Sequence, residues 1–69
     1  MNTRTTIRDK YNNPIGWIIE SEWMKQGYTN YKGLVGYYDK RSKMTRYVNG
    51  ELYSRDDDLR ALVREEASK

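Results

Sequence analysis

The chain has 69 residues, a formal net charge of +3, and neither cysteine nor histidine. A chain of this length holds one small hydrophobic core, so we expect a single domain over residues 1–69. The missing cysteines exclude disulfide bonds, and without cysteine and histidine the usual zinc sites cannot form. Small domains often need such a supplement, and self-association is the one that this composition leaves open.

Aromatic residues take the place of most aliphatic ones: the chain has seven tyrosines, two tryptophans and no phenylalanine. Such side chains bury an apolar body but keep a polar tip that needs water or a partner, which suits a thin, half-exposed sheet. No apolar run approaches the roughly 20 residues of a membrane-spanning helix. Residues 1–4 are not followed by the apolar stretch of a signal peptide, so we expect a cytoplasmic protein.

Charge is distributed unevenly along the chain. Residues 25–50 hold six basic residues and one acidic residue, whereas residues 51–69 hold four basic and six acidic ones. Such a basic block can attract an anionic partner, and it can equally be a solvated surface that keeps a small protein in solution.

Turn-forming residues recur at short intervals, Gly16, Gly27 and Gly36 among them, and separate runs rich in Ile, Val, Thr, Trp and Tyr. This rhythm is typical of strands and turns. It predicts strands near residues 5–8, 15–20, 27–30, 34–39, 44–48 and 52–54, grouped in hairpin units at about 5–20, 27–39 and 44–55. Asn49-Gly50 is the strongest turn signal, because both residues tolerate the positive φ of a type I′ hairpin turn. Asn12-Asn13 before Pro14 predicts another turn.

Residues 20–26 do not fit this rhythm and look like an insertion. The segment can form a helical turn or a longer loop. We expect its one large apolar side chain, Trp23, to fold back on the sheet rather than to stand exposed as an anchor for a partner.

Near the end of the chain the apolar period changes, because Leu59, Leu62 and Val63 recur at i, i+3 and i+4. This spacing predicts a helix over about residues 56–67, with Ser54 or Asp56 as its cap. A helix of this length is not stable alone, so its apolar face must dock on the sheet or on another chain. The predicted fold class is mainly β: antiparallel hairpin repeats forming a small open or shallow barrel-like sheet, with one short C-terminal α-helix.

Three hairpin segments resemble one another, which predicts a pseudo-symmetric arrangement. Their motifs include Thr6-Ile7-Arg8-Asp9, Gly36-Tyr37-Tyr38-Asp39 and Thr45-Arg46-x-x-x-Gly50, followed by Leu59-x-x-Leu62. On these motifs the chain resembles the four-fold β-flower domains over residues 5–63. The resemblance implies a shallow β-barrel whose hairpins spread like petals, and it brings no catalytic motif. Asn12 and Tyr47 depart from the family pattern, and three petals are recognisable where a ring needs four, so the ring is partial or completed by another chain.

The residue types needed for catalysis are scarce. Histidine and nucleophilic cysteine are absent, no serine lies in a G-x-S-x-G setting, and no phosphate-binding glycine motif occurs. Asp56-Asp57-Asp58 is the one carboxylate cluster, and helix capping explains it more simply than a metal does. We therefore expect no enzyme, no cofactor and no metal.

Nucleic-acid binding is one alternative that the sequence leaves open. Basic and aromatic residues interleave in the middle of the chain: Lys32, Lys40, Arg41, Lys43 and Arg46 alternate with Tyr31, Tyr37, Tyr38 and Tyr47. Cations that neutralise phosphates beside rings that stack on bases suit single-stranded nucleic acid. Tyrosines at such positions also serve as cross-strand packing in sheets.

A protein partner or a homo-oligomer is the favoured interpretation. The core is small, the sheet has edges that need covering, and interfaces favour Tyr, Trp, Met and Arg. We expect a non-enzymatic binding domain with Tyr37, Tyr38, Arg41 and Arg46 as the candidate face. Its size also suits an accessory protein of a phage or mobile element that targets a host component. A lipid or small ligand in a shallow barrel lined by Trp17, Ile19 and Leu34 is a further alternative.

Overall fold

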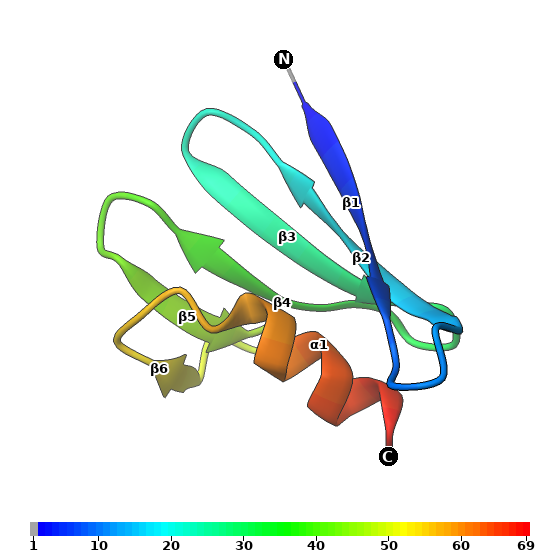
Figure 1. Ribbon diagram of the computed structural model, residues 1–69. Helices are drawn as coiled ribbons and strands as arrows, with labels where there is room; N and C mark the ends of the chain where they lie inside the picture. The colour runs from blue at the N-terminus through cyan, green and yellow to red at the C-terminus, as the bar shows by residue number, and fades with distance from the viewer. Residues whose placement is uncertain (1) are drawn as a thin grey trace.

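Six strands and one helix follow one another in the computed structural model, which describes residues 2–69 (Figure 1). The strands are β1 (Thr3–Arg8), β2 (Pro14–Glu20), β3 (Met24–Thr29), β4 (Gly33–Asp39), β5 (Met44–Tyr47) and β6 (Leu52–Ser54), and the helix is α1 (Leu59–Ala67). Neighbouring strands pair antiparallel in the order β1-β2-β3-β4-β5-β6. The sheet stays open, since β1 and β6 lie at opposite edges. The predicted mainly-β class with one C-terminal helix is confirmed, and the open sheet is the alternative that holds.

A hairpin forms at Asn49-Gly50 between β5 and β6 as predicted, but it is not a type I′ turn, because Gly50 has a positive φ and Asn49 does not. Gly50 has a φ of 95°, and its backbone N–H donates to the Tyr47 carbonyl at 2.9 Å. At the β1–β2 turn Asn12 has a φ of 67°, the left-handed conformation that asparagine tolerates better than most residues. Both turns therefore rest on the residue types that made them recognisable in the sequence.

The segment at 20–26 is neither a helical turn nor a long loop. It is a tight hairpin, in which the N–H of Ser21 donates to the Met24 carbonyl at 2.8 Å and Glu20 pairs with Lys25. The expected burial of Trp23 is wrong, because its side chain is 54% exposed. Trp23 lies at the tip of this hairpin, beyond the end of the sheet, so it has no sheet surface to fold onto. Its ring lies instead under the guanidinium of Arg41, 4.5 Å from the ring centroid.

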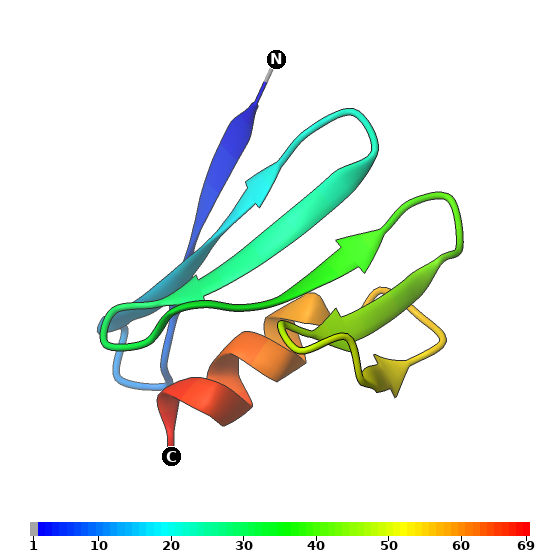
Figure 2. The same ribbon diagram turned by 180° about the vertical axis from the view of Figure 1, so that it is seen from behind.

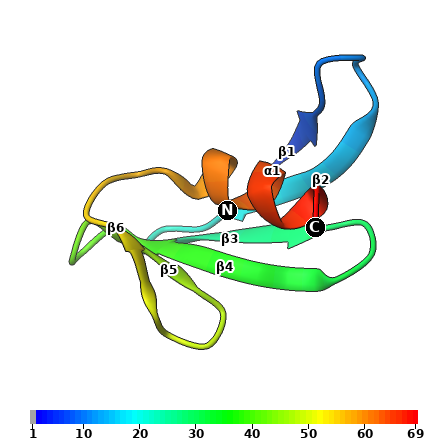
Figure 3. The ribbon, with the colours of Figure 1, turned by 90° about the horizontal axis from the view of Figure 1, so that it is seen from below.

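Helix α1 lies on three glycines, one from each of β2, β3 and β4: Gly16, Gly27 and Gly36. A Cβ atom at Gly27 would come within 2.7 Å of Val63 Cγ2, and one at Gly36 within 2.8 Å of a Leu62 methyl carbon. The missing side chains therefore let the helix approach the sheet backbone closely. Viewed from below, β3 and β4 pass under α1 while β1 and β2 rise beside it (Figure 3).

The core is the layer between α1 and the sheet. Its buried apolar residues are Ile7, Ile18, Val35, Leu59, Leu62 and Val63, and the last three confirm the predicted apolar face of the helix. Within residues 2–69 the structure shows no helix long and apolar enough to cross a membrane. We expect no signal peptide at residues 1–4, and Met1 of that segment lies outside the described residues.

The helix begins at Leu59, later than the predicted start at residue 56, and neither Ser54 nor Asp56 caps it. Thr45 of β5, which is fully buried, takes that role from the sheet. Its hydroxyl donates to the Asp56 carbonyl at 2.5 Å and accepts from the Asp58 N–H at 3.1 Å. The preceding chain is therefore held against β5 until Asp58, and only then can it turn into the helix.

Replacing Thr45 by valine keeps the shape of the side chain but removes its hydroxyl. We expect the Thr45→Val variant to lose about 0.5–1.5 kcal/mol of unfolding free energy, because the Asp56 carbonyl and the Asp58 N–H then lose the hydroxyl that joins them to β5. Amide hydrogen exchange at Asp58 checks the cause, since its N–H should lose protection in this variant and keep it in Thr45→Ser. Unchanged protection in Thr45→Val would contradict the anchoring role.

A side-chain hydrogen bond also joins β6 to α1. The hydroxyl of Tyr53 donates a 2.6 Å hydrogen bond to Glu65 Oε2, and this bond raises the pKa of Tyr53 to about 12. Below pH 10.0, the ordinary pKa of tyrosine, the bond makes its full contribution to the stability of the folded state. This contribution is lost as the pH rises through about 12, the pKa of Tyr53 in the folded state.

We therefore expect the unfolding free energy of the wild type to fall more steeply between about pH 10 and 12 than that of Tyr53→Phe. Urea unfolding at several alkaline pH values measures both profiles. Parallel profiles for the two proteins would show that the bond to Glu65 does not favour the neutral phenol.

Candidate functional site

The sheet face opposite α1 carries no covering layer; we call it the open face. Side chains alternate along a strand, and Gly27 faces the helix, so Gln26 and Tyr28 must point the other way. Cross-strand pairing extends this assignment to the neighbouring strands. One row of the open face runs through Arg4, Ile19, Gln26, Tyr37, Arg46 and Leu52, and a second runs through Thr6, Trp17, Tyr28 and Leu34.

An aromatic stack forms the centre of the open face. The Trp17 and Tyr28 rings lie parallel, with an interplanar angle of 5° and centroids 5.3 Å apart. The guanidinium of Arg4 lies over the Trp17 ring, 4.7 Å from its centroid. The Trp17 ring is thus engaged by both an aromatic and a cationic neighbour on the sheet itself. Such contacts fix the indole in place before any partner arrives.

Most side chains next to this stack are apolar. Ile19, Leu34 and Tyr37 are half-buried although no element covers them, because they pack on their neighbours in the rows. Neither row contains lysine or glutamate. The charges present are the arginines Arg4 and Arg46, and Arg46 donates to the Gly50 carbonyl at 2.9 Å. The open face is therefore a largely apolar and aromatic surface with arginines toward both edges of the sheet.

The four predicted face residues do not share one surface. Tyr37 and Arg46 are direct cross-strand partners on the open face. Tyr38 points to the other side and packs against the core under α1. Arg41 lies in the turn after β4, stacked on Trp23. The structure thus brings together two of the four residues and adds residues that were not assigned to this face.

The residues missed as part of that face are Tyr28 and Gln26, together with Trp17 and Ile19, which were considered only as a ligand-cavity lining. The alternation of Trp17 and Ile19 around Ile18 is a period of two that could have placed both on one face. Leu34 belongs to the same surface, across from Tyr28.

The basic block of the middle segment is dispersed in the fold. Lys40 contacts Glu20 at 2.7 Å, and Lys32 lies 3.7 Å from Glu66 of α1. The hydrogen bond from Lys40 lowers the pKa of the Glu20 carboxyl, so this pair stays ionised at neutral pH. Two of the interleaved tyrosines, Tyr38 and Tyr47, pack on the core rather than beside these cations.

The carboxylate cluster before α1 is also engaged within the chain. Asp57 accepts a 2.6 Å bond from Lys25, which raises the pKa of that lysine. Over residues 2–69 no group of three or more Asp, Glu, His or Cys side chains is arranged to hold a metal ion.

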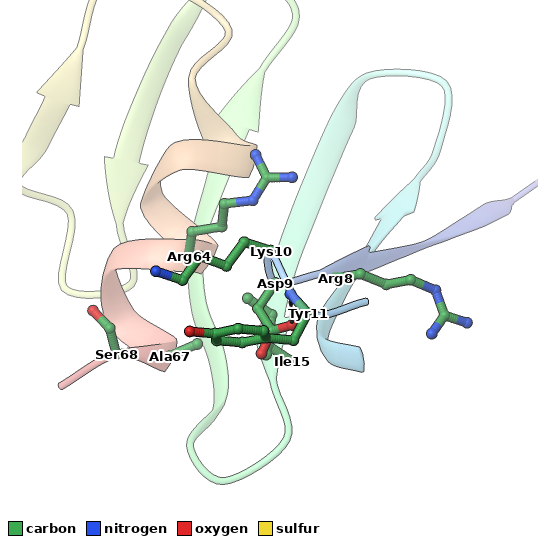
Figure 4. Close-up of a pocket in the computed structure, with 8 residues that line it drawn as sticks. All are labelled: Arg8, Asp9, Lys10, Tyr11, Ile15, Arg64, Ala67 and Ser68. Atoms are coloured by element: carbon green, nitrogen blue, oxygen red, sulfur yellow. Dashed lines mark hydrogen bonds between the residues drawn. The ribbon is translucent and has the colours of Figure 1, made fainter. Parts of the chain in front are cut away.

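A cleft of about 600 Å³ lies between the β1–β2 turn and the last turn of α1 (Figure 4). The C-terminus of the chain lies beside the β1–β2 turn in both side views (Figures 1 and 2). Tyr11, Ile15 and Ala67 form the apolar wall of the cleft, and Arg8, Lys10 and Arg64 are its basic residues. Its size lies within the range of small-molecule sites, about 300–1,000 Å³. No sequence pattern indicates this cleft, because it forms between segments about 50 residues apart.

No family model, curated protein or solved structure matches this chain. The resemblance to four-fold β-flower domains therefore stays a prediction, and function has to be argued from the surfaces themselves.

Proposed function

We propose that this chain is a non-enzymatic binding domain that holds another protein against its open face. The observation that carries the proposal is the uncovered layer of aromatic and aliphatic side chains around Trp17 and Tyr28, in rows without lysine or glutamate. Contiguous apolar surface of this kind marks interaction sites on small proteins. Protein interfaces are enriched in Tyr, Trp and Arg and depleted in Lys and Glu, which is the composition of these rows.

The arrangement of the rings favours a protein over a nucleic acid. Base stacking needs a free ring face, whereas the Trp17 ring already has Tyr28 against it and Arg4 over it. Phosphate binding needs available cations, whereas Lys40 and Lys32 lie beside carboxylates. Apolar rings on an uncovered sheet face instead fit the close packing of a second protein layer.

The open sheet likewise favours a protein over a lipid held inside a barrel. Trp17, Ile19 and Leu34, the expected lining, lie on the uncovered face of an open sheet instead. A partner covering this face would also add the burial that a domain of this size lacks. Such a partner is a second copy of the chain or another protein, including a host component bound by a phage or mobile-element accessory protein.

The Ile19→Lys variant tests the proposal, because it places a charge in the centre of the open face without touching the core. We expect it to weaken partner binding or self-association by at least about tenfold, since burying an unpaired charge in an interface costs more than 1.4 kcal/mol. Sedimentation velocity measures self-association, and affinity capture from the native cell followed by titration of the recovered protein measures other partners.

Tyr31→Lys is the matched control, since Tyr31 is 95% exposed at the β3–β4 turn, outside both rows. It should bind as the wild type does, and circular dichroism should show both variants folded. Equal binding by wild type and Ile19→Lys would overturn the proposal. Retardation of a single-stranded oligonucleotide at low salt, unaffected by Ile19→Lys, would favour the nucleic-acid alternative.

A further inference from the structure

The cleft beside the β1–β2 turn has an apolar wall that is held in position. The Tyr11 side chain is 73% exposed, yet the turn that carries it is fixed by its own hydrogen bonds. Asp9 Oδ1 accepts from the backbone N–H groups of Tyr11 and Asn13, both at 2.9 Å. Ile15 packs on the core and also lines the cleft. An exposed ring on a rigid turn costs little entropy when a ligand packs against it.

Two cations, Lys10 and Arg64, line this cleft and have no carboxylate partner within residues 2–69. Lys10 Nζ lies 5.2 Å from the Tyr11 ring centroid, and its side chain reaches from the turn toward α1 (Figure 4). Arg64 comes from α1 on the other side of the cleft. By contrast, three other lysines in or near α1 form ion pairs. Lys25 pairs with Asp57, which precedes the helix, and Lys32 and Lys69 pair with Glu66.

The remaining charged groups of the cleft are turned to internal partners. The Asp9 carboxylate is directed to backbone N–H groups of its own turn, and Arg8 points away from the helix and donates to the Asn12 carbonyl at 3.0 Å. The positive charges of Lys10 and Arg64 are therefore the ones available to a ligand. A group placed between them must be an anion, and the body attached to it must be apolar to fit the wall.

We propose that this cleft binds a single-chain aliphatic carboxylate. The carboxylate lies between Lys10 and Arg64, and the hydrocarbon chain lies along Tyr11, Ile15 and Ala67. The site is separate from the open face, and binding here does not depend on a protein partner.

Titration of the ¹⁵N-labelled protein with sodium decanoate below its micelle concentration tests this assignment. We expect amide shifts to gather at residues 9–15 and 64–68, with weaker binding for butanoate, which lacks the tail, and for methyl decanoate, which lacks the charge. Shifts gathered on the open face, or equal binding of methyl decanoate, would overturn it.

Substitutions distinguish a specific binding site for decanoate from the general attraction of an anion to a basic protein. Lys10→Gln and Arg64→Gln should each raise the dissociation constant for decanoate about three- to tenfold, because each removes one charge-assisted contact. Arg60→Gln removes the same charge from an exposed position one helical turn earlier, outside the cleft, and should leave the constant unchanged. An equal loss in Arg60→Gln would contradict the proposal, and dispersed amide spectra confirm folding of every variant.

Discussion

Replacing Leu62 by alanine should lower the free energy of unfolding by about 2–5 kcal/mol. Leu62 is fully buried and packs from α1 onto Gly36 of β4, which has no side chain of its own to refill the space. A 69-residue domain has a total stability of about 3–10 kcal/mol, so a loss at the upper end leaves much of the chain unfolded at 25 °C.

Urea unfolding followed by circular dichroism measures this loss. Arg60→Ala is the control on the same helix, because Arg60 is exposed and its replacement should change the stability by no more than about 0.5 kcal/mol. A loss below 1 kcal/mol for Leu62→Ala would mean that α1 is not docked on the sheet as described.

Replacing Gly16 by alanine is the second large effect, and its cause is the opposite one. The added Cβ would run into the backbone carbonyl oxygen of Tyr28 on the adjacent strand and would lie 2.8 Å from Val63 Cγ1. Overpacking of this kind costs about 1–3 kcal/mol or more, and a backbone atom in a paired strand cannot move aside as a side chain can. We expect a loss at the top of that range.

Gly27→Ala provides the comparison, because the three atoms nearest to its added Cβ belong to the side chains of Val63 and Leu59. These can shift by a few tenths of an ångström, so the loss should be smaller than for Gly16→Ala. Thermal unfolding of the two variants measures the difference. A larger loss for Gly27→Ala would show that the helix, and not the neighbouring strand, limits the space at these glycines.

Local chemistry explains why the strands and turns could be predicted from the sequence. Gly50 and Asn12 adopt the positive φ angles that their residue types allow, and the strands between the turns follow. The helix face at Leu59, Leu62 and Val63 follows from the i, i+3, i+4 spacing alone. These signals lie within a few residues of the structure that they determine.

Features that depend on distant segments could not be predicted in this way. The sequence pattern predicts turns near Gly16, Gly27 and Gly36, whereas the three glycines lie inside strands and form the surface on which α1 packs. This role depends on where the helix docks. The start of the helix depends on Thr45, which lies 13 residues before Asp58. Each of these outcomes is decided by tertiary contact and not by local propensity.

In the candidate site, too, some features follow from the local sequence and others depend on tertiary contacts. Tyr37 and Tyr38 are adjacent in one strand, so their side chains must point to opposite faces, which the sequence could have indicated. Which of the two faces is covered depends on where α1 docks. The stack of Trp17 on Tyr28 likewise depends on the register between β2 and β3.

Chemical-shift mapping of the ¹⁵N-labelled protein, first over a range of its own concentrations and then with a captured partner, tests most directly whether the uncovered sheet surface is where a second protein binds. We expect the perturbed signals to gather on β2, β3 and β4 and to include the Trp17 indole N–H, with the exposed side of α1 unaffected. Perturbations centred on the exposed side of α1, with the Trp17 signal unchanged, would contradict it.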